Sequence, residues 1–356
     1  MSRLFVAASA HGYGHLSQIA PVINGLRRDL PGLQVVIQGD LPTEFIRSRI
    51  DGPFELLAEA CDVGMVMENP LTANWQATHE AYRLFHQDSA ARLKRQRALL
   101  ESAAPDLLLA DVPWLPLVAA KDLGIPAVGL CSLTWFDILH EGPMSTLPLE
   151  DCLRDMKQAY QQADLFLRPA PSMPMAWLPN SHLIGPLAIR GKPYREEIIA
   201  RLGLPSESRI GLLQFGGVSG TVAADALPLL DGLVWLVPEI IEAGRCDFFT
   251  VPEGIAFIDL MASCDLMITK PGYNSFTEAA ANGLPLLSAA RNEWPESRWL
   301  VDWVAERIPF RQLTQAEWRP EPLKSAIESM LEAPRPELTP ATGVEDALAL
   351  LRPWFS

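Results

Sequence analysis

Basic residues, cysteines and long apolar runs are scarce in this sequence. Lys and Arg number 29 against 43 Asp and Glu, and the formal net charge of −14 argues against nucleic acid as a partner. The five cysteines are scattered without a C-x-x-C pair, which is typical of reduced core thiols and predicts a cytoplasmic protein. No apolar stretch approaches the ~18 residues of a spanning helix, and the run at 4–8 is too short for a signal peptide. We therefore expect a soluble chain without a transmembrane segment.

What the sequence does contain is typical of a globular enzyme. Apolar residues make up 49% and charged residues 20% of the 356 residues, which excludes a disordered chain and fits two domains or one large one. Strand-like and helix-like segments alternate, which predicts an α/β fold with parallel sheets. The expected strands are 3–8, 33–38, 106–110, 127–130, 209–214, 265–269 and 286–288, and the expected helices are 16–30, 73–102, 115–123, 276–282 and 341–351.

The alternation falls into two series, and each series opens with a glycine-rich turn from strand to helix. We therefore expect two Rossmann-like domains whose parallel sheets face each other across a deep cleft, with a linker at 181–191. The predicted units are 1–187, 188–335 and a C-terminal helix within 336–356. Ligands bind at the carboxyl ends of parallel strands, where helix N-termini present free N–H groups to anions. An acidic protein of this kind can still bind a diphosphate.

The first glycine-rich turn reads His11-Gly12-Tyr13-Gly14-His15. Its spacing approaches the dinucleotide fingerprint, and Asp40 follows about 20 residues later, as in NAD-binding proteins. An NAD-dependent oxidoreductase is therefore one interpretation. However, a nicotinamide site has no need of an imidazole at the first helical turn. His15 is better placed there as a base or an anion contact.

The second turn reads Lys270-Pro271-Gly272-Tyr273-Asn274-Ser275 and leads to Glu278. Gly272 allows a phosphate to approach the backbone closely, and Asn274 and Ser275 lie where N-cap residues belong. Ser275 and Glu278 also have the spacing of a capping box, which is the purely structural alternative for these two residues.

The longer string KPGYNSFTEAAANGLP resembles the nucleotide-sugar loop of the plant-type UDP-glycosyltransferases, H-C-G-W-N-S-x-x-E-x-x-x-x-G-V-P. It is also similar to a loop of the bacterial transferase that adds UDP-GlcNAc to lipid I. Both families have the GT-B fold. The resemblance implies that the glycine turn, Asn274 and Ser275 hold the diphosphate and that Glu278 binds the ribose. Lys270 and Tyr273 stand where the plant family has His and Trp, and K-P-G-Y with G-H-G-x-G-H is typical of a branch that includes the N-terminal region of plant arabinose kinases.

Other segments of these families follow in the expected order. GYGH resembles Q-G-H-x-x-P, which implies that His15 is the catalytic base beside the donor contact Gly14, and LLLADVPWLPLVAAKDLGIPAVGL implies that Asp111 pairs with it. FGGVSG resembles a loop near the donor phosphates, and IAFIDLMASCDLMIT resembles the segment that reads uracil. The donor contacts implied by these two segments are Gly216, Gly217, Ser219, Phe257 and Ile258.

Two departures concern the donor. The plant-type P-x-x-x-D-Q motif, which holds the sugar, is replaced by the run from Ala290 to Glu296, in which Arg291 and Glu296 are the candidate sugar contacts. The Trp–Gln pair that selects uracil is absent. UDP is thus the nucleotide that the resemblance favours, while the sugar and the acceptor stay open.

The resemblance implies a metal-independent, inverting glycosyltransferase that moves a hexose-type sugar from a nucleoside diphosphate to an acceptor hydroxyl. A D-x-D motif for a metal clamp is missing from the sequence, and no cofactor is expected beyond the nucleotide-sugar co-substrate. A homo-oligomer stays open. The alternatives, besides the oxidoreductase, are a non-hydrolysing UDP-sugar epimerase and a catalytically silent nucleotide-sugar-binding protein.

Overall fold

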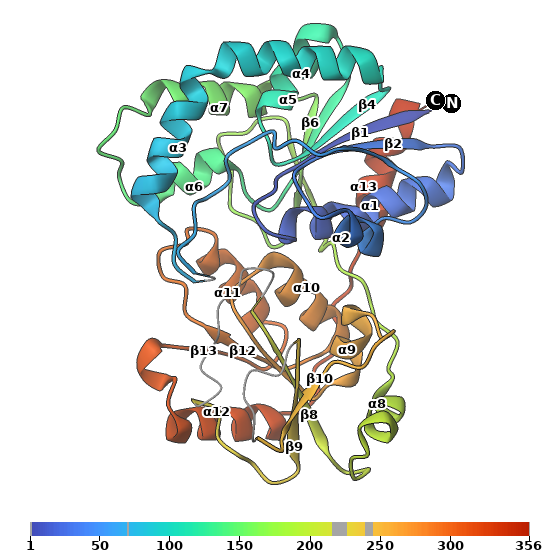
Figure 1. Cartoon of the computed structure of the whole chain (residues 1–356), viewed down its shortest axis with the longest axis vertical. Helices are drawn as coiled ribbons and strands as arrows, with labels where there is room; N and C mark the ends of the chain where they lie inside the picture. Colours follow the sequence, from blue (N-terminus) through green and yellow to red (C-terminus); the bar gives the residue numbers. More distant parts are fainter. Residues whose placement is uncertain (1, 70, 216–225, 239–244, 356) are drawn as a thin grey trace.

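A computed structural model describes residues 2–69, 71–215, 226–238 and 245–355. Its described strands form two parallel sheets in two α/β domains, one at the top and one at the bottom of Figure 1. The N-terminal sheet has the order β3-β2-β1-β4-β5-β6-β7, and the C-terminal sheet has the order β10-β9-β8-β11-β12-β13. Both are doubly wound orders whose direction reverses beside the first strand, the point at which such sheets bind ligands.

The N-terminal domain follows the predicted alternation. Its strands are β1 (Arg3–Ala8), β2 (Gln34–Gln38), β3 (Glu55–Leu57), β4 (Leu107–Asp111), β5 (Ala127–Leu130), β6 (Leu165–Pro169) and β7 (Ser181–Ile184). Its helices are α1 (Gly14–Asp29), α2 (Thr43–Arg49), α3 (Trp75–Gln87), α4 (Ser89–Ala103), α5 (Leu115–Leu123), α6 (Trp135–Glu141) and α7 (Glu150–Gln162).

The C-terminal domain repeats the pattern. Its strands are β8 (Arg209–Gln214), β9 (Leu233–Val237), β10 (Phe248–Thr250), β11 (Leu266–Thr269), β12 (Leu286–Ala289) and β13 (Phe310–Leu313). The helices of this half are α8 (Arg195–Leu202), α9 (Phe257–Ser263), α10 (Tyr273–Asn282), α11 (Ser297–Ala305) and α12 (Pro320–Glu332), and α13 (Gly343–Leu351) follows them.

Three sequence-based expectations about single elements were wrong. The helix expected at 73–102 is interrupted at Asp88, which ends α3 and precedes α4. The linker expected at 181–191 contains the edge strand β7. This strand was not predicted because it has no buried apolar run, since His182 and Leu183 are exposed. Helix α10 begins at Tyr273 rather than 276, because Gly272 is its N-cap in an extended conformation.

Helix α13 returns to the N-terminal domain and packs against α1 (Figure 1). The side chain of Leu348 lies directly over Gly25, where a Cβ would come within 2.8 Å of it. The chain therefore crosses between the domains twice, once after β7 and once before α13. The two crossings touch each other, since the amide of Gly343 donates to the carbonyl of Pro186 at 3.1 Å. The C-terminal sheet is thus inserted between β7 and α13.

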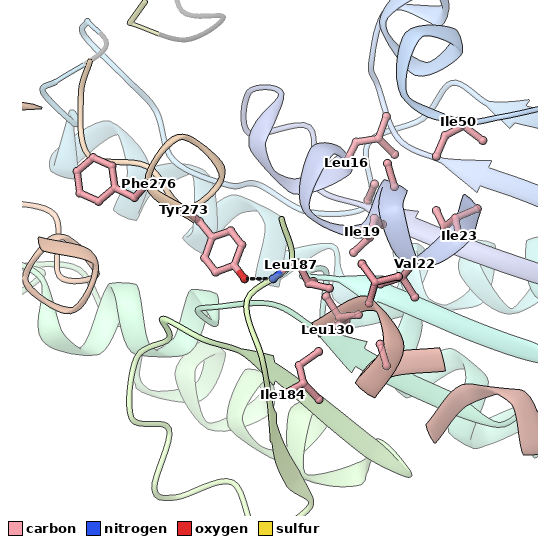
Figure 2. Close-up of a cluster of buried hydrophobic side chains, with 14 of the residues drawn as sticks. Leu16, Ile19, Val22, Ile23, Ile50, Leu130, Ile184, Leu187, Tyr273 and Phe276 are labelled. Atoms are coloured by element: carbon pink, nitrogen blue, oxygen red, sulfur yellow. Dashed lines mark hydrogen bonds between the residues drawn. The ribbon is translucent and has the colours of Figure 1, made fainter. Parts of the chain in front are cut away.

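Figure 2 shows how the two domains meet beside α1. The buried hydroxyl of Tyr273 accepts a hydrogen bond from the amide of Leu187 at 2.9 Å and donates one to the carbonyl of Ala170 at 3.1 Å. Leu16 and Ile19 of α1 belong to the same apolar cluster as Tyr273 and Phe276. The first turn of α10 is therefore fixed against the N-terminal domain.

Candidate functional site

The centre of the site is a buried pair of side chains at the reversal point of the N-terminal sheet. His15 lies in the first turn of α1, directly after β1, and Asp111 ends the neighbouring strand β4. The His15 Nδ1 atom is 2.8 Å from Asp111 Oδ1. Burial disfavours the imidazolium, but the charge and hydrogen bond of Asp111 outweigh it and raise the pKa of His15. Nδ1 is thereby occupied, and Nε2 has no hydrogen-bond partner among the residues that the structure describes.

A second histidine of the same turn links the domains. The ring of His11 stacks on Trp294 with the centroids 5.7 Å apart and meets Trp135 edge-on at 5.5 Å. Its Nδ1 accepts the amide of Met65 at 3.2 Å. Burial, together with the charge of His15, lowers the pKa of His11 to about 3, so His11 is neutral and donates only through Nε2.

Asp62 is a further carboxylate beside the pair, and the sequence analysis did not find it. Its Oδ2 accepts the indole N–H of Trp135 at 2.7 Å, and burial raises its pKa while the positive charge of His15 lowers it. Asp62 lies on an irregular segment between β3 and α3 that matches no motif and no periodic pattern. Only the tertiary structure brings it to His15.

The second glycine-rich turn meets the first across the domain boundary. The Asn274 side-chain N–H group donates to the carbonyl of Gly14 at 2.8 Å. Asn274 and Ser275 lie inside the first turn of α10 and not at its N-cap, and no side-chain cap is formed, so the capping-box alternative was wrong. The first amides of a helix have no partner within it, and here they follow Gly272 at the carboxyl end of β11. Tyr273 points toward the interdomain crossing instead, as described above.

Two cations follow neighbouring strands of the C-terminal sheet. Lys270 comes directly after β11, and burial with the nearby charge of Arg291 lowers its pKa to about 8. Arg291 comes after β12, and its guanidinium lies 3.8 Å from the ring centroid of Trp294. Glu296 is buried, and its carboxylate accepts hydrogen bonds from Ser132 at 2.7 Å and from the indole of Trp294 at 3.1 Å. A chain of polar contacts therefore joins the domains beside His15.

The remaining predicted donor contacts are spread along the C-terminal domain. Glu278 lies on α10 among buried groups, and burial raises its pKa to about 7 while Arg49 of α2 opposes that shift. Phe257 and Ile258 open α9 and pack on the apolar core, half-buried. The predicted contacts Gly216, Gly217 and Ser219 lie outside the described residues.

The side chain of Cys131 completes a cluster with the central pair. Its sulfur is 3.8 Å from His15 Nδ1, and ligand atoms of His15, Asp111 and Cys131 all lie within 4.8 Å of one another. These residue types can hold a metal ion. In this structure the Nδ1 atom forms a hydrogen bond with Asp111, which is the arrangement of a general base and its orienting carboxylate.

Comparison with known proteins gives one curated relative, and no family model matches the chain. The L-arabinokinase of Arabidopsis thaliana is 24% identical over 324 residues, which cover 88% of this chain and 31% of that protein. The chain thus spans about a third of the length of the relative that it matches. In the described part of the chain, no helix has the length and apolar character needed to cross a membrane.

Solved structures match over nearly the whole chain. The spinosyn forosaminyltransferase SpnP has a TM-score of 0.65 at 15% identity, covering 99% of this chain and 94% of that one. A UDP-glucosyltransferase from Polygonum tinctorium capable of glucosylating indoxyl has a TM-score of 0.60 at 16% identity, covering 100% and 99%. The calicheamicin glycosyltransferase CalG4 has a TM-score of 0.61 at 16% identity, covering 99% and 94%. The predicted fold class is confirmed: the chain has the GT-B fold of nucleotide-sugar glycosyltransferases.

Proposed function

We propose that the protein is a metal-independent, inverting glycosyltransferase that moves a sugar from a nucleoside diphosphate, with UDP favoured, to an acceptor hydroxyl. The observation that carries the proposal is the buried His15–Asp111 pair, 2.8 Å apart at the reversal point of the N-terminal sheet. The pair lies opposite the first turn of α10, which Asn274 joins to Gly14. In this proposal, the base His15 faces the helix terminus that binds the diphosphate across the domain boundary. The transferases named above with the same fold add support.

In the proposed reaction, His15 Nε2 accepts the proton of the acceptor hydroxyl. The acceptor oxygen then forms a bond to the anomeric carbon of the sugar, while the bond from that carbon to the diphosphate oxygen breaks. The products are the glycoside, the nucleoside diphosphate and a protonated His15. Asp111 holds the imidazole in one tautomer and stabilises the imidazolium, and general-base help of this kind is worth roughly 10²–10⁴-fold in rate.

The leaving diphosphate gains negative charge, and the chain offers it positive groups in place of a metal. We assign the first amides of α10 and the ammonium of Lys270 to this role, since a helix N-terminus and a lysine both attract phosphate. Glu278 would bind the ribose hydroxyls, and Phe257 and Ile258 would contact the base. Gly14, Gly216, Gly217 and Ser219 are proposed as backbone contacts of the donor.

One observation favours a second candidate, the UDP-sugar epimerase. That reaction needs further acid and base groups, and Asp62 lies beside His15 with a raised pKa. However, its Oδ2 atom is bound to the indole of Trp135. An epimerase would interconvert two nucleotide sugars in the absence of any acceptor, whereas a transferase would consume the donor only when an acceptor is present or by slow hydrolysis.

Calorimetric titration with UDP, dTDP, GDP and NAD tests the donor site. We expect micromolar binding of UDP to the wild type and at least tenfold weaker binding to Glu278→Ala, with Glu321→Ala, an exposed glutamate of α12, as the matched control. His15→Ala should keep UDP binding and lose sugar transfer to an acceptor panel, while His182→Ala on the exposed edge strand keeps both. Binding of NAD alone, or UDP binding indifferent to Glu278, would contradict the proposal.

A further inference from the structure

Arg291 is a buried cation held in a fixed position without an acidic partner. Its side chain is only 6% exposed, its guanidinium stacks on Trp294 at 3.8 Å, and its Nη2 atom is 3.7 Å from the sulfur of Met67 in the other domain. Within residues 2–69, 71–215, 226–238 and 245–355, no carboxylate lies at ion-pair distance from it. A cation taken out of water is costly unless an anion compensates it.

The nearest acidic group is already engaged. Glu296 attracts Arg291 and Lys270 from a distance, but its two oxygen atoms accept hydrogen bonds from Ser132 and Trp294. Burial lowers the pKa of Arg291 to about 10, so the guanidinium stays charged at neutral pH. Lys270 and Arg291 thus place two positive charges near one carboxylate, and one positive charge is left for a ligand.

Arg291 lines a cavity. A cavity of about 450 Å³ at the domain boundary is lined by residues of the C-terminal domain, among them Arg291, Trp294 and Gln312, and by Glu141 of α6. The other arginine of this cavity, Arg298, forms an ion pair with Glu141 at 2.8 Å and is therefore compensated. The volume is within the usual range of ligand sites, and the second carboxylate of the lining, Asp302, is exposed to solvent.

The position of Arg291 separates this anion from the diphosphate. Lys270 and α10 follow β11, and the proposed function gives them the diphosphate. Arg291 follows β12, the next strand of the sheet, whose Ser288 pairs with Thr269 of β11. A group bound to Arg291 would therefore lie next to the proposed diphosphate site, in the segment 290–296 that the family resemblance assigns to the transferred sugar. A planar guanidinium whose face is covered by an indole presents its edge, which matches a carboxylate in two parallel hydrogen bonds.

We propose that Arg291 binds a carboxylate of the transferred sugar, so that the donor is a nucleoside diphosphate hexuronic acid rather than a neutral hexose. This inference rests on the proposed function. It deepens that function by naming the substrate class of the same site.

The test compares UDP, UDP-glucose and UDP-glucuronic acid by calorimetry on the full chain. We expect the wild-type protein to bind UDP-glucuronic acid at least about tenfold more tightly than UDP-glucose. This is the usual effect of a hydrogen-bonded pair between a guanidinium and a carboxylate. Arg291→Met should reduce this ratio to about one, and Arg291→Lys should restore part of it. Arg154→Met is the matched control, since it removes an exposed arginine of α7, paired with Asp151 and outside this cavity, and should keep the wild-type ratio.

The contradicting outcomes are distinct. If UDP binds but the two UDP-sugars bind equally to wild-type protein, this inference is wrong and the proposed function stands. The inference is also wrong if free glucuronate binds to the UDP-saturated protein through Arg291 while the two UDP-sugars remain equal, because the anion then belongs to the acceptor. Failure of UDP itself to bind overturns both proposals.

Discussion

The proposed reaction depends on how Asp111 acts on the imidazole of His15. The carboxylate is fully buried, its Oδ1 atom bonds to His15, and its Oδ2 atom has no hydrogen-bond partner in the part of the chain that the structure describes. Such a group orients His15 and favours its protonated form. A general base works only when it has lost its proton, so the proposed role of His15 predicts an activity that depends on pH.

Substitution of Asp111 tests this dependence. We expect the kcat/KM of wild-type protein to rise with pH through a midpoint above 6.5, because the raised pKa keeps His15 protonated below it. In Asp111→Asn the opposing effects of burial and of the charges on Asp62 and Glu296 remain, while the charge of Asp111 is lost, so the midpoint should shift to lower pH and the plateau should fall roughly 10²–10⁴-fold. Rates measured from pH 5 to 9 check both effects.

The control is Asp231→Asn, an exposed aspartate of the C-terminal domain, which should keep the wild-type profile. An unchanged midpoint in Asp111→Asn would show that a group other than His15 causes the rise of kcat/KM with pH. A loss of rate at every pH without a shifted midpoint would leave Asp111 with a structural role only.

Helix α10 joins the fold and the site at the scale of an element. The first amides of α10 have no partner within the helix, while Tyr273 fixes the same turn to the backbone of the other domain at Leu187 (Figure 2) and at Ala170. The amide of Leu187 has the Tyr273 hydroxyl as its partner, and the leucine is buried. The proposed diphosphate site is therefore positioned by a side chain that points away from it.

Removing that hydroxyl should destabilise the protein. Tyr273→Phe leaves the buried amide of Leu187 without a partner, and we expect the free energy of unfolding to fall by about 1–3 kcal/mol. Urea unfolding followed by tryptophan fluorescence measures the change. Tyr13→Phe, whose ring stacks on Phe45 at an exposed position, is the matched control and should leave the transition in place. Equal transitions for both variants would contradict the role given to Tyr273.

The sequence predicted the turns far better than the contacts between them. The segments around His15 and Lys270 are local strings after buried strands, and both stand where they were expected. Strands β3, β6, β9, β10 and β13 were not predicted, and two of these, β3 and β10, have only three residues each. The hydrogen bond from Asn274 to Gly14 joins residues that are 260 positions apart in the sequence, and a local sequence pattern cannot predict such a contact. Asp62 and the interdomain partners of Arg291 were missed for the same reason.

At the scale of the whole molecule, α13 is part of the N-terminal core although it follows the C-terminal domain. Leu348 is 5% exposed and fills the space above Gly25 of α1. We expect Leu348→Ala to lower the free energy of unfolding by about 2–5 kcal/mol, since it opens a cavity in this contact. Thermal and urea unfolding measure the loss, and Leu229→Ala, at a 65% exposed leucine, is the control. A loss no larger than that of the control would mean that α13 contributes little to this core.

The insertion of one domain into the other also sets an order for protein synthesis. The ribosome makes α1 early and α13 only after the whole C-terminal sheet, so the surface of α1 around Gly25 stays uncovered while that sheet is made. The first domain to emerge is thus the last to be completed. An uncovered apolar surface on a growing chain is a target for chaperones and for aggregation. Slow translation through the C-terminal domain would prolong this exposure, whereas a rapidly folding C-terminal domain would bring α13 to its place as soon as it leaves the ribosome.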